Sequence, residues 1–400
     1  MIPRVSGMAD TEPTLFGNYQ FEVYLKGMSG ETLDFPMGWA ELEAQASAAM
    51  DPGARGYVFG SAGTEDTERE NRAAFTRHRI VPRMLRDVSS RDLRIEIFGV
   101  QHAAPVLLAP IGVQSIVHPD GELAAARGAA AGGIGFVAST AASYAMEDIA
   151  AAGRDVPHWY QLYWPKDPEL TASFVARAEA AGYGAIVVTL DTGLLAWRPR
   201  DLQTAYLPFL KSVGIANYLS DPVFRAALPE PPEQNPTAAV LQFVSVFSNP
   251  AVSWADLAAL RALTTMPILL KGIVHPDDAR LARDHGVQGV VVSNHGGRQV
   301  DGAIAALDAL PDVVDAVGDD LTVLFDSGIR CGSDVVKALA LGARAVLLGR
   351  PYLWGMALRG ADGVAQVIRN LLSEVDLTLA LSGHTSPRTL NPAVLSRRPA

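Results

Sequence analysis

Cysteine is almost absent from this sequence, which has Cys331 and no other among its 400 residues. A single cysteine cannot form an internal disulfide, and no cysteine cluster is present to hold zinc or an iron–sulfur centre, so we expect no bound metal. Positive charge is also scarce: 33 Lys and Arg stand against 43 Asp and Glu, for a formal net charge of −10. General nucleic-acid binders and anionic-membrane binders need a basic surface, so we expect neither kind of partner.

Long uncharged apolar runs are missing as well. No stretch reaches the roughly 18–20 residues that a membrane helix needs. The richest candidate, 123–140, consists largely of Ala and Gly and is interrupted by Arg127. The first twenty residues have no basic segment followed by an apolar run, so we expect no signal peptide. These absences together predict a soluble, cytoplasmic protein.

The sequence does contain a repeated pattern of an apolar strand followed by an Ala-rich helix. Eight strands are predicted, at 104–109, 133–139, 158–163, 184–190, 266–271, 288–293, 321–326 and 344–349. Apart from one gap, each begins roughly 20–35 residues after the last, which suits a strand–helix unit. Continuous apolar strands alternating with amphipathic helices indicate a parallel sheet covered on both faces. A doubly wound sheet usually has a Gly-rich turn after its first strand, whereas 110–112 reads Pro-Ile-Gly. We therefore predict an α/β fold, a (β/α)₈ TIM barrel.

The chain is longer than such a barrel requires, because a typical barrel needs about 250 residues. We assign 1–103 to an N-terminal extension that packs on the barrel, and 104–400 to the barrel itself. Predicted strands four and five are separated by the long segment 193–265, which contains Pro-rich patches. Long loops on the C-terminal face of a barrel are often lids or binding loops, so we expect a lid there.

Polar residues follow nearly every predicted strand. In barrel enzymes the catalytic residues lie at the C-terminal ends of the strands. Buried polar groups cost free energy unless they are paired, so we expect these side chains to face a ligand. In chain order they are Ser139, Gln161 with Tyr163, Thr189 with Asp191, Lys271, Ser293 with His295 and Arg298, Asp326 with Arg330, and Gly349 with Arg350.

The last two strand ends predict a phosphate site. Gly328 and Arg330 lead into a helix predicted to begin near Ser333, and the eighth strand ends in Gly349 and Arg350. Glycines and a helix N-terminus after strands seven and eight bind phosphate in many barrels, and arginine adds two-point hydrogen bonds. The alternative is a pair of Gly-Arg loops that hold no ligand.

His295 follows the sixth strand and precedes two glycines and Arg298. A histidine in this position can act as a general base near neutral pH, and the arginine can clamp a carboxylate. A lone histidine is more often structural than catalytic, so we interpret the other seven as structural or solvated.

Lys271 ends a buried apolar strand, where an unpaired charge would cost several kcal/mol. Three interpretations remain open. The lysine forms a Schiff base, it is a fixed positive charge that stabilises an anionic cofactor, or it pairs with a neighbouring carboxylate such as Asp326.

Taken together, five motifs resemble one family. They are SNHGGRQ (293–299), ILLKG (268–272), WYQLYW (159–164), VTLDT (188–192) and DSGIR to GRP (326–351), and they are similar to those of the FMN-dependent 2-hydroxy acid oxidases and dehydrogenases. The resemblance extends from about 56 to 383. Within the family, AWRPRDL (196–202), NYLSDPVF (217–224) and FGNYQFEVY (16–24) look most like lactate 2-monooxygenase. The family fold is a (β/α)₈ barrel.

The resemblance implies a role for each matching residue. His295 would take a proton from the 2-hydroxy acid, and Asp191 would hydrogen-bond His295 and stabilise its protonated form. Lys271 would stabilise the negative charge of reduced FMN. Arg198 and Arg298 would bind the substrate carboxylate. Tyr57 would complete that clamp unless it packs in the core, and Tyr163 would lie near the hydroxyl. FMN would be bound by Ser139, Gln161, Thr189, Ser293, Pro110 and Ile111 at the flavin ring, Asp326 at the ribityl chain, and Gly328, Arg330, Gly349 and Arg350 at the phosphate.

The resemblance also implies a reaction, the oxidation of L-lactate by O2 to acetate, CO2 and water. Ala141 stands where glycolate oxidases have a bulky Trp, which favours lactate over glycolate. The long 193–265 segment, with Trp197 beside Arg198, suggests that pyruvate is retained. The alternatives are an L-lactate oxidase that releases pyruvate and H2O2, a related 2-hydroxy acid dehydrogenase and, more distantly, a Schiff-base aldolase that uses Lys271. Relatives are often tetramers, so we expect a homo-oligomer.

Overall fold

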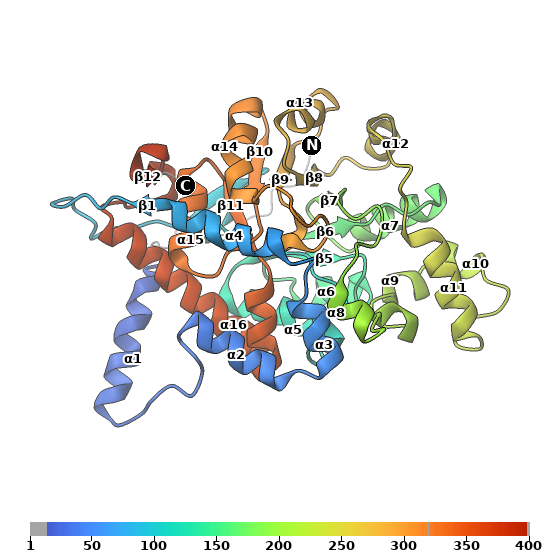
Figure 1. Cartoon of the computed structure of the whole chain (residues 1–400), viewed down its shortest axis with the longest axis horizontal. Helices are drawn as coiled ribbons and strands as arrows, with labels where there is room; N and C mark the ends of the chain where they lie inside the picture. The colour runs from blue at the N-terminus through green and yellow to red at the C-terminus, as the bar shows by residue number, and fades with distance from the viewer. Residues whose placement is uncertain (1–13, 319, 398–400) are drawn as a thin grey trace.

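The computed structural model describes residues 14–318 and 320–397, and its centre is a closed barrel of eight parallel strands (Figure 1). The strands are β4 (Val106–Leu108), β5 (Gly135–Ser139), β6 (His158–Leu162), β7 (Ile186–Thr189), β8 (Ile268–Ile273), β9 (Gly289–Val292), β10 (Thr322–Phe325) and β11 (Ala345–Leu348). β11 pairs with β4 and closes the ring. The predicted (β/α)₈ barrel is confirmed. Residues 1–13, which begin the predicted extension and the segment in which we expect no signal peptide, lie outside the described residues.

Helices connect the strands and cover the outside of the barrel. They are α5 (Gly121–Gly132), α6 (Met146–Ala152), α7 (Pro168–Ala180), α13 (Pro276–Asp284), α14 (Ala306–Val317), α15 (Gly332–Ala340) and α16 (Arg350–Leu381). Local sequence explains where α7 begins. The Asp167 side chain accepts hydrogen bonds from the Glu169 and Leu170 amides, and Pro168 occupies the first helical position. Among the described residues no helix is long and apolar enough to cross a membrane.

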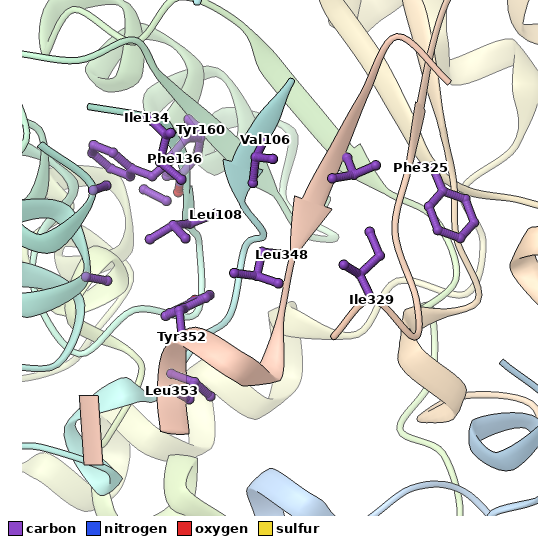
Figure 2. Packing of buried hydrophobic residues seen from close by; sticks show 14 of the residues in the cluster. Val106, Leu108, Ile134, Phe136, Tyr160, Phe325, Ile329, Leu348, Tyr352 and Leu353 are labelled. Carbon is purple, nitrogen blue, oxygen red and sulfur yellow. The ribbon is translucent and has the colours of Figure 1, made fainter. Parts of the chain in front are cut away.

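The strand side chains alternate between two apolar layers. One layer packs between the strands and the helices, and Figure 2 shows Val106, Leu108 and Leu348 in it with Tyr352 of α16. The other layer fills the barrel, with Leu107, Val137, Trp159, Val187, Leu269, Val291, Leu324 and Leu347. Because successive strand residues point to opposite faces, the next inward position lies two residues further on, at the C-terminal end of each strand. These positions are Ala109, Ser139, Gln161, Thr189, Lys271, Ser293, Asp326 and Gly349.

The residues before β4 form helices and two small sheets. The helices are α1 (Tyr19–Met28), α2 (Trp39–Ala49), α3 (Pro52–Phe59) and α4 (Asp66–Arg77), and β1 (His78–Ile80) pairs with β12 (Leu395–Arg397) near the C-terminus. The hairpin of β2 (Ile95–Ile97) and β3 (Val100–His102) places Ile95 and Ile97 in the inner layer. The hairpin therefore closes the end of the barrel opposite the strand carboxyl ends.

The segment 193–265 contains several short helices of its own. They are α8 (Pro199–Gln203), η3 (Pro208–Lys211), α9 (Ala216–Leu219), α10 (Pro222–Ala226), α11 (Pro236–Phe247), η4 (Trp254–Asp256) and α12 (Leu257–Ala262). Aromatic rings hold these pieces together. Phe243 lies 4.8 Å from Phe247 and 4.9 Å from Tyr218, and Phe209 lies 5.3 Å from Phe243, between ring centroids. This small core fixes the segment over the carboxyl ends of the strands.

Candidate active site

A cavity opens to solvent at the carboxyl ends of the strands. The predicted site residues in its lining are Tyr57, Pro110, Ile111, Tyr163, Arg198, Lys271, His295, Arg298, Asp326, Gly328, Arg330, Gly349 and Arg350. The others adjoin this lining from the strand ends. Ser139 Oγ accepts from the amide of the lining residue Ala141 at 3.1 Å and donates to Gln161. Thr189 pairs with Lys271, and Ser293 and Asp191 bond to lining residues. The fold thus gathers all of the predicted residues at one end of the barrel.

His295 and Asp191 form a hydrogen-bonded pair at the cavity wall. The imidazole Nδ1 lies 2.7 Å from Asp191 Oδ1. The backbone of His295 has a φ of 57°, in the left-handed region that non-glycine residues rarely adopt. Two side chains hold this turn in place, because the His295 amide donates to Ser293 Oγ at 3.1 Å and the Gly296 amide donates to Ser327 Oγ at 3.0 Å. We assign the Nδ1 proton from this geometry, which leaves Nε2 as an acceptor.

The electrostatics of the pair suit a general base. Burial, reinforced by the charges of Lys271 and Arg198, lowers the pKa of His295 even though Asp191 opposes this change. The imidazole is therefore neutral near pH 7 and able to accept a proton. Burial acts to raise the pKa of Asp191, but the nearby His295 and Lys271 prevail and lower it to about 2. An ionised Asp191 stabilises the imidazolium that forms once His295 has taken the proton.

Lys271 is a buried cation that is paired. Its ammonium lies 3.0 Å from Asp326 Oδ2 and donates to Ser293 Oγ at 2.8 Å. Burial opposes the charged form, yet Asp326 and Asp191 together raise the pKa of Lys271 above its usual value. A Schiff base requires a neutral amine, so this environment does not favour that interpretation. The geometry instead combines the other two interpretations of Lys271: it is paired with Asp326, and it is a fixed positive charge in the cavity wall.

Two arginines stand on another wall. Arg198 is buried, and its Nε donates to the Arg298 carbonyl at 3.0 Å. Arg298 Nη1 donates to the carbonyls of Tyr57 at 2.6 Å and Gly60 at 2.5 Å, and its guanidinium lies 4.9 Å from the Tyr57 ring centroid. Burial and the neighbouring Arg198 lower the pKa of Arg298 to about 9. Two adjacent cations, a buried Arg198 and a partly buried Arg298, make this wall suitable for a carboxylate.

Gln299 is a site residue to which the sequence analysis assigned no role. Its Nε2 donates to the Asp191 carbonyl at 2.6 Å and the Leu194 carbonyl at 3.2 Å, and its Oε1 accepts from Arg198 at 2.7 Å. One amide thus joins the turn that carries His295 to the start of the 193–265 segment. Its position at the end of SNHGGRQ is the sequence signal that could have revealed it.

A second pair of arginines lies where β10 and β11 end. Arg330 stacks 4.9 Å from the Trp354 ring centroid, and burial together with Arg350 lowers the pKa of Arg330 to about 10. Arg350 donates to the Val58 carbonyl at 3.0 Å and to Ser61 Oγ at 2.8 Å. Beside them, a Cβ added at Gly349 would meet no atom within 4 Å. Open space beside these two partly buried guanidinium groups fits a phosphate.

A model of the family described as FMN-dependent dehydrogenase matches residues 46–397. The chain belongs to this family. An L-lactate oxidase of Lysinibacillus sphaericus is 43% identical over 374 residues, which cover 94% of this chain and 96% of that protein. An FMN-dependent alpha-hydroxy acid dehydrogenase of Schizosaccharomyces pombe is 44% identical over 389 residues, with the same coverage of 94% and 96%. A crystal structure of mandelate oxidase matches with a TM-score of 0.80 and 38% identity, over 91% of this chain and 98% of that one.

The protein is therefore an FMN-dependent oxidoreductase, as the resemblance implied, and its cavity fits the family's cofactor. The arginine pair beside Gly349 fits the phosphate. Gln161 Nε2 is a buried donor with no hydrogen-bond partner among the described residues, although Gln161 Oε1 accepts from Ser139 Oγ. A flavin ring carries carbonyl and nitrogen acceptors that such a donor can bind. Lys271 supplies the positive charge that reduced FMN requires.

The loop after β4, which lines the cavity at Pro110 and Ile111, rests on a buried carboxyl group. Glu122 accepts a hydrogen bond from the Gln114 amide at 3.0 Å, and Gln114 Nε2 donates to the Ile111 carbonyl at 2.8 Å. Burial raises the pKa of Glu122 to about 7, and its hydrogen bonds only partly oppose this rise. The folded protein therefore holds a proton on Glu122 that the unfolded chain releases above about pH 4.5.

This proton makes the stability of the protein depend on pH. Because the folded-state pKa lies above the unfolded one, Glu122 costs stability increasingly as pH rises from about 4.5 through 7. We expect Glu122→Gln to raise the free energy of unfolding at pH 8 by on the order of 1–3 kcal/mol, with little gain at pH 4.5. Urea unfolding at both pH values with saturating FMN measures the difference. An equal change at both would contradict the protonated state of Glu122.

Proposed function

We propose that this protein oxidises L-lactate with O2 and retains the resulting pyruvate, which peroxide then decarboxylates in the site to acetate, CO2 and water. This is the activity of a lactate 2-monooxygenase. Bound FMN would accept the two electrons that leave the substrate and pass them to oxygen. The protein supplies the base, the carboxylate clamp and the fixed charges.

The geometry of the cavity supports the roles that the resemblance implies. Arg198 and Arg298 bind the substrate carboxylate, and Tyr163 lies near the hydroxyl. With the acid held there, His295 Nε2 removes the hydroxyl proton, and the imidazolium is stabilised by Asp191 at 2.7 Å. Binding the carboxylate at a fixed wall orients the carbon–hydrogen bond that breaks.

The observation that carries the retention of pyruvate is the folded 193–265 segment. Phe209 and Phe247 belong both to its aromatic core and to the lining of the cavity, at 5.5 Å between ring centroids. Ala141 also lines the cavity and leaves room for the methyl group of lactate. Trp197 does not contribute, because its side chain is 74% exposed and lies outside the lining. A lid fixed by its own core slows product release.

A second candidate is an L-lactate oxidase that releases pyruvate and hydrogen peroxide. Two relatives support it, because the proteins of Lysinibacillus sphaericus and of Nostoc, 43% and 41% identical, are both named L-lactate oxidase. The two activities share every step up to the reduction of oxygen and differ in whether pyruvate leaves before peroxide reacts with it.

A product balance distinguishes the two activities. The purified yellow protein is incubated with L-lactate in air without catalase, and acetate, pyruvate and peroxide are quantified. We expect one acetate for each lactate consumed and little free peroxide. Equal amounts of pyruvate and peroxide would overturn the proposed retention and assign an oxidase. Free pyruvate and peroxide added to the enzyme without lactate give the background of acetate formed in solution.

A further inference from the structure

The two arginines that fit the FMN phosphate are already in contact with a carboxylate of the protein. Glu68 Oε1 lies 3.2 Å from Arg350 Nη1 and 3.9 Å from Arg330 Nη2. Its other oxygen accepts from Ser61 Oγ at 2.9 Å, and Ser61 Oγ in turn accepts from Arg350 at 2.8 Å. Glu68 is therefore part of the same polar cluster, although it does not line the cavity.

Glu68 is held in this place by its helix. It lies in the first turn of α4, which is fixed to the turn after β9 because Asp301 accepts from the Asp66 amide at 2.7 Å. The approach is close: a Cβ added at Gly297, whose φ is +81°, would lie 2.6 Å from the Glu68 amide nitrogen. The side chain is only 23% exposed. These contacts hold the backbone of Glu68 close to the two arginines.

The charges around the phosphate position make Glu68 and a bound phosphate compete for the same two arginines. A phosphate monoester carries about −1.5 to −2 charges near pH 7, which two arginines would balance. The nearby Arg72 is already paired with Asp334 at 2.6 Å, so it does not add to this sum. The Glu68 carboxylate neutralises part of the charge of Arg330 and Arg350 and repels the phosphate once it binds.

We propose that Glu68 is a competing countercharge that weakens FMN binding through the phosphate group and so sets how readily the cofactor dissociates. It satisfies the arginines when FMN is absent and opposes the phosphate when FMN is present. The inference depends on FMN binding in this cavity and is independent of which hydroxy acid is oxidised. Glu68 is a positioning residue for the two arginines, and it touches no reacting atom.

The test compares FMN with riboflavin, which has the same ring system and no phosphate. The variant Glu68→Gln keeps an oxygen that accepts from Ser61 and removes the charge. We expect its Kd for FMN, measured by flavin fluorescence on the full-length chain, to fall roughly ten-fold. The Kd for riboflavin should stay within about two-fold of the wild type. The control is Glu70→Gln on the same helix, whose carboxylate pairs with Arg77 away from the site, and it should change neither constant.

Two outcomes would overturn the proposal. An FMN Kd that is unchanged or larger in Glu68→Gln would show that the carboxylate supports the arginines more than it opposes the phosphate. A similar fall in the Kd for FMN and for riboflavin would show that Glu68 does not act through the phosphate group. If the variant does not fold, Glu68→Ala is measured in the same way, with the same expected ratio between the two flavins. In either variant, the rate at which FMN leaves the diluted holoenzyme should fall with the FMN Kd.

Discussion

Replacing His295 by glutamine should reduce the rate of flavin reduction by L-lactate roughly 10³–10⁴-fold, while FMN stays bound. Glutamine is similar in size and can still donate to Asp191, but it has no nitrogen that accepts a proton. The mutation therefore removes the base and leaves the turn after β9 and the two substrate arginines in place. Anaerobic stopped-flow mixing of the holoenzyme with L-lactate, followed by flavin absorbance, measures the rate directly.

The pH dependence of the same rate gives a second readout of His295. Since burial lowers the pKa of His295 from 6.5, the wild-type rate should fall only when the pH drops below that value. The residual rate of His295→Gln should not show this fall at low pH. His285→Gln is the matched control, because that histidine is exposed on the far end of α13. Rapid reduction by His295→Gln with an unchanged pH profile would remove His295 from the mechanism.

The second large effect is expected for Lys271→Met. Loss of the fixed charge should slow flavin reduction by L-lactate about 10²–10³-fold. It should also lower the two-electron midpoint potential of the flavin by tens of millivolts, where about 30 mV corresponds to 1.4 kcal/mol. The reason is that the reduced flavin carries a negative charge that Lys271 stabilises more than it stabilises the neutral oxidised form.

Lys271→Met also leaves Asp326 buried without its partner, which costs about 3–5 kcal/mol of stability. The double variant Lys271→Met with Asp326→Asn separates this cost from the electrostatic role. We expect the double variant to recover most of the lost free energy of unfolding and none of the lost rate or potential. Recovery of the potential together with the stability would contradict a specific role for the lysine charge.

The strands and the strand-end residues could be predicted from the sequence for one physical reason. An inward-facing apolar residue is followed two positions later by the polar residue that enters the cavity, as Leu324 is by Asp326 and Leu269 by Lys271. Side chains along a strand alternate with a period of two, which determines the direction of these side chains. The right-handed strand–helix repeat determines the fold. The role of His295 also required the resemblance, because spacing alone does not distinguish a base from a structural histidine.

Contacts between distant parts of the chain were beyond prediction. The pairing of Glu68 with Arg350 depends on how α4 crosses the turn after β9, which no local pattern encodes. The same holds for the partners of Gln299. The motif marks that residue, but Asp191 and Leu194 lie 108 and 105 residues before it in the sequence and contact it only in the folded chain. For Trp197, a local pattern was misleading. Its position beside Arg198 in the sequence suggested that it covers the site, whereas in the fold its side chain is exposed to solvent.

The central claim is that this cavity oxidises an L-2-hydroxy acid by removing two protons and two electrons. His295 takes the hydroxyl proton, and FMN would accept the two electrons together with the hydrogen of the carbon–hydrogen bond. The most direct measurement is anaerobic mixing of the wild-type holoenzyme with L-lactate and, separately, D-lactate. We expect full bleaching of the flavin by L-lactate within the turnover time, and no bleaching by D-lactate over the same period. An oxidised spectrum that persists in saturating L-lactate would contradict the account.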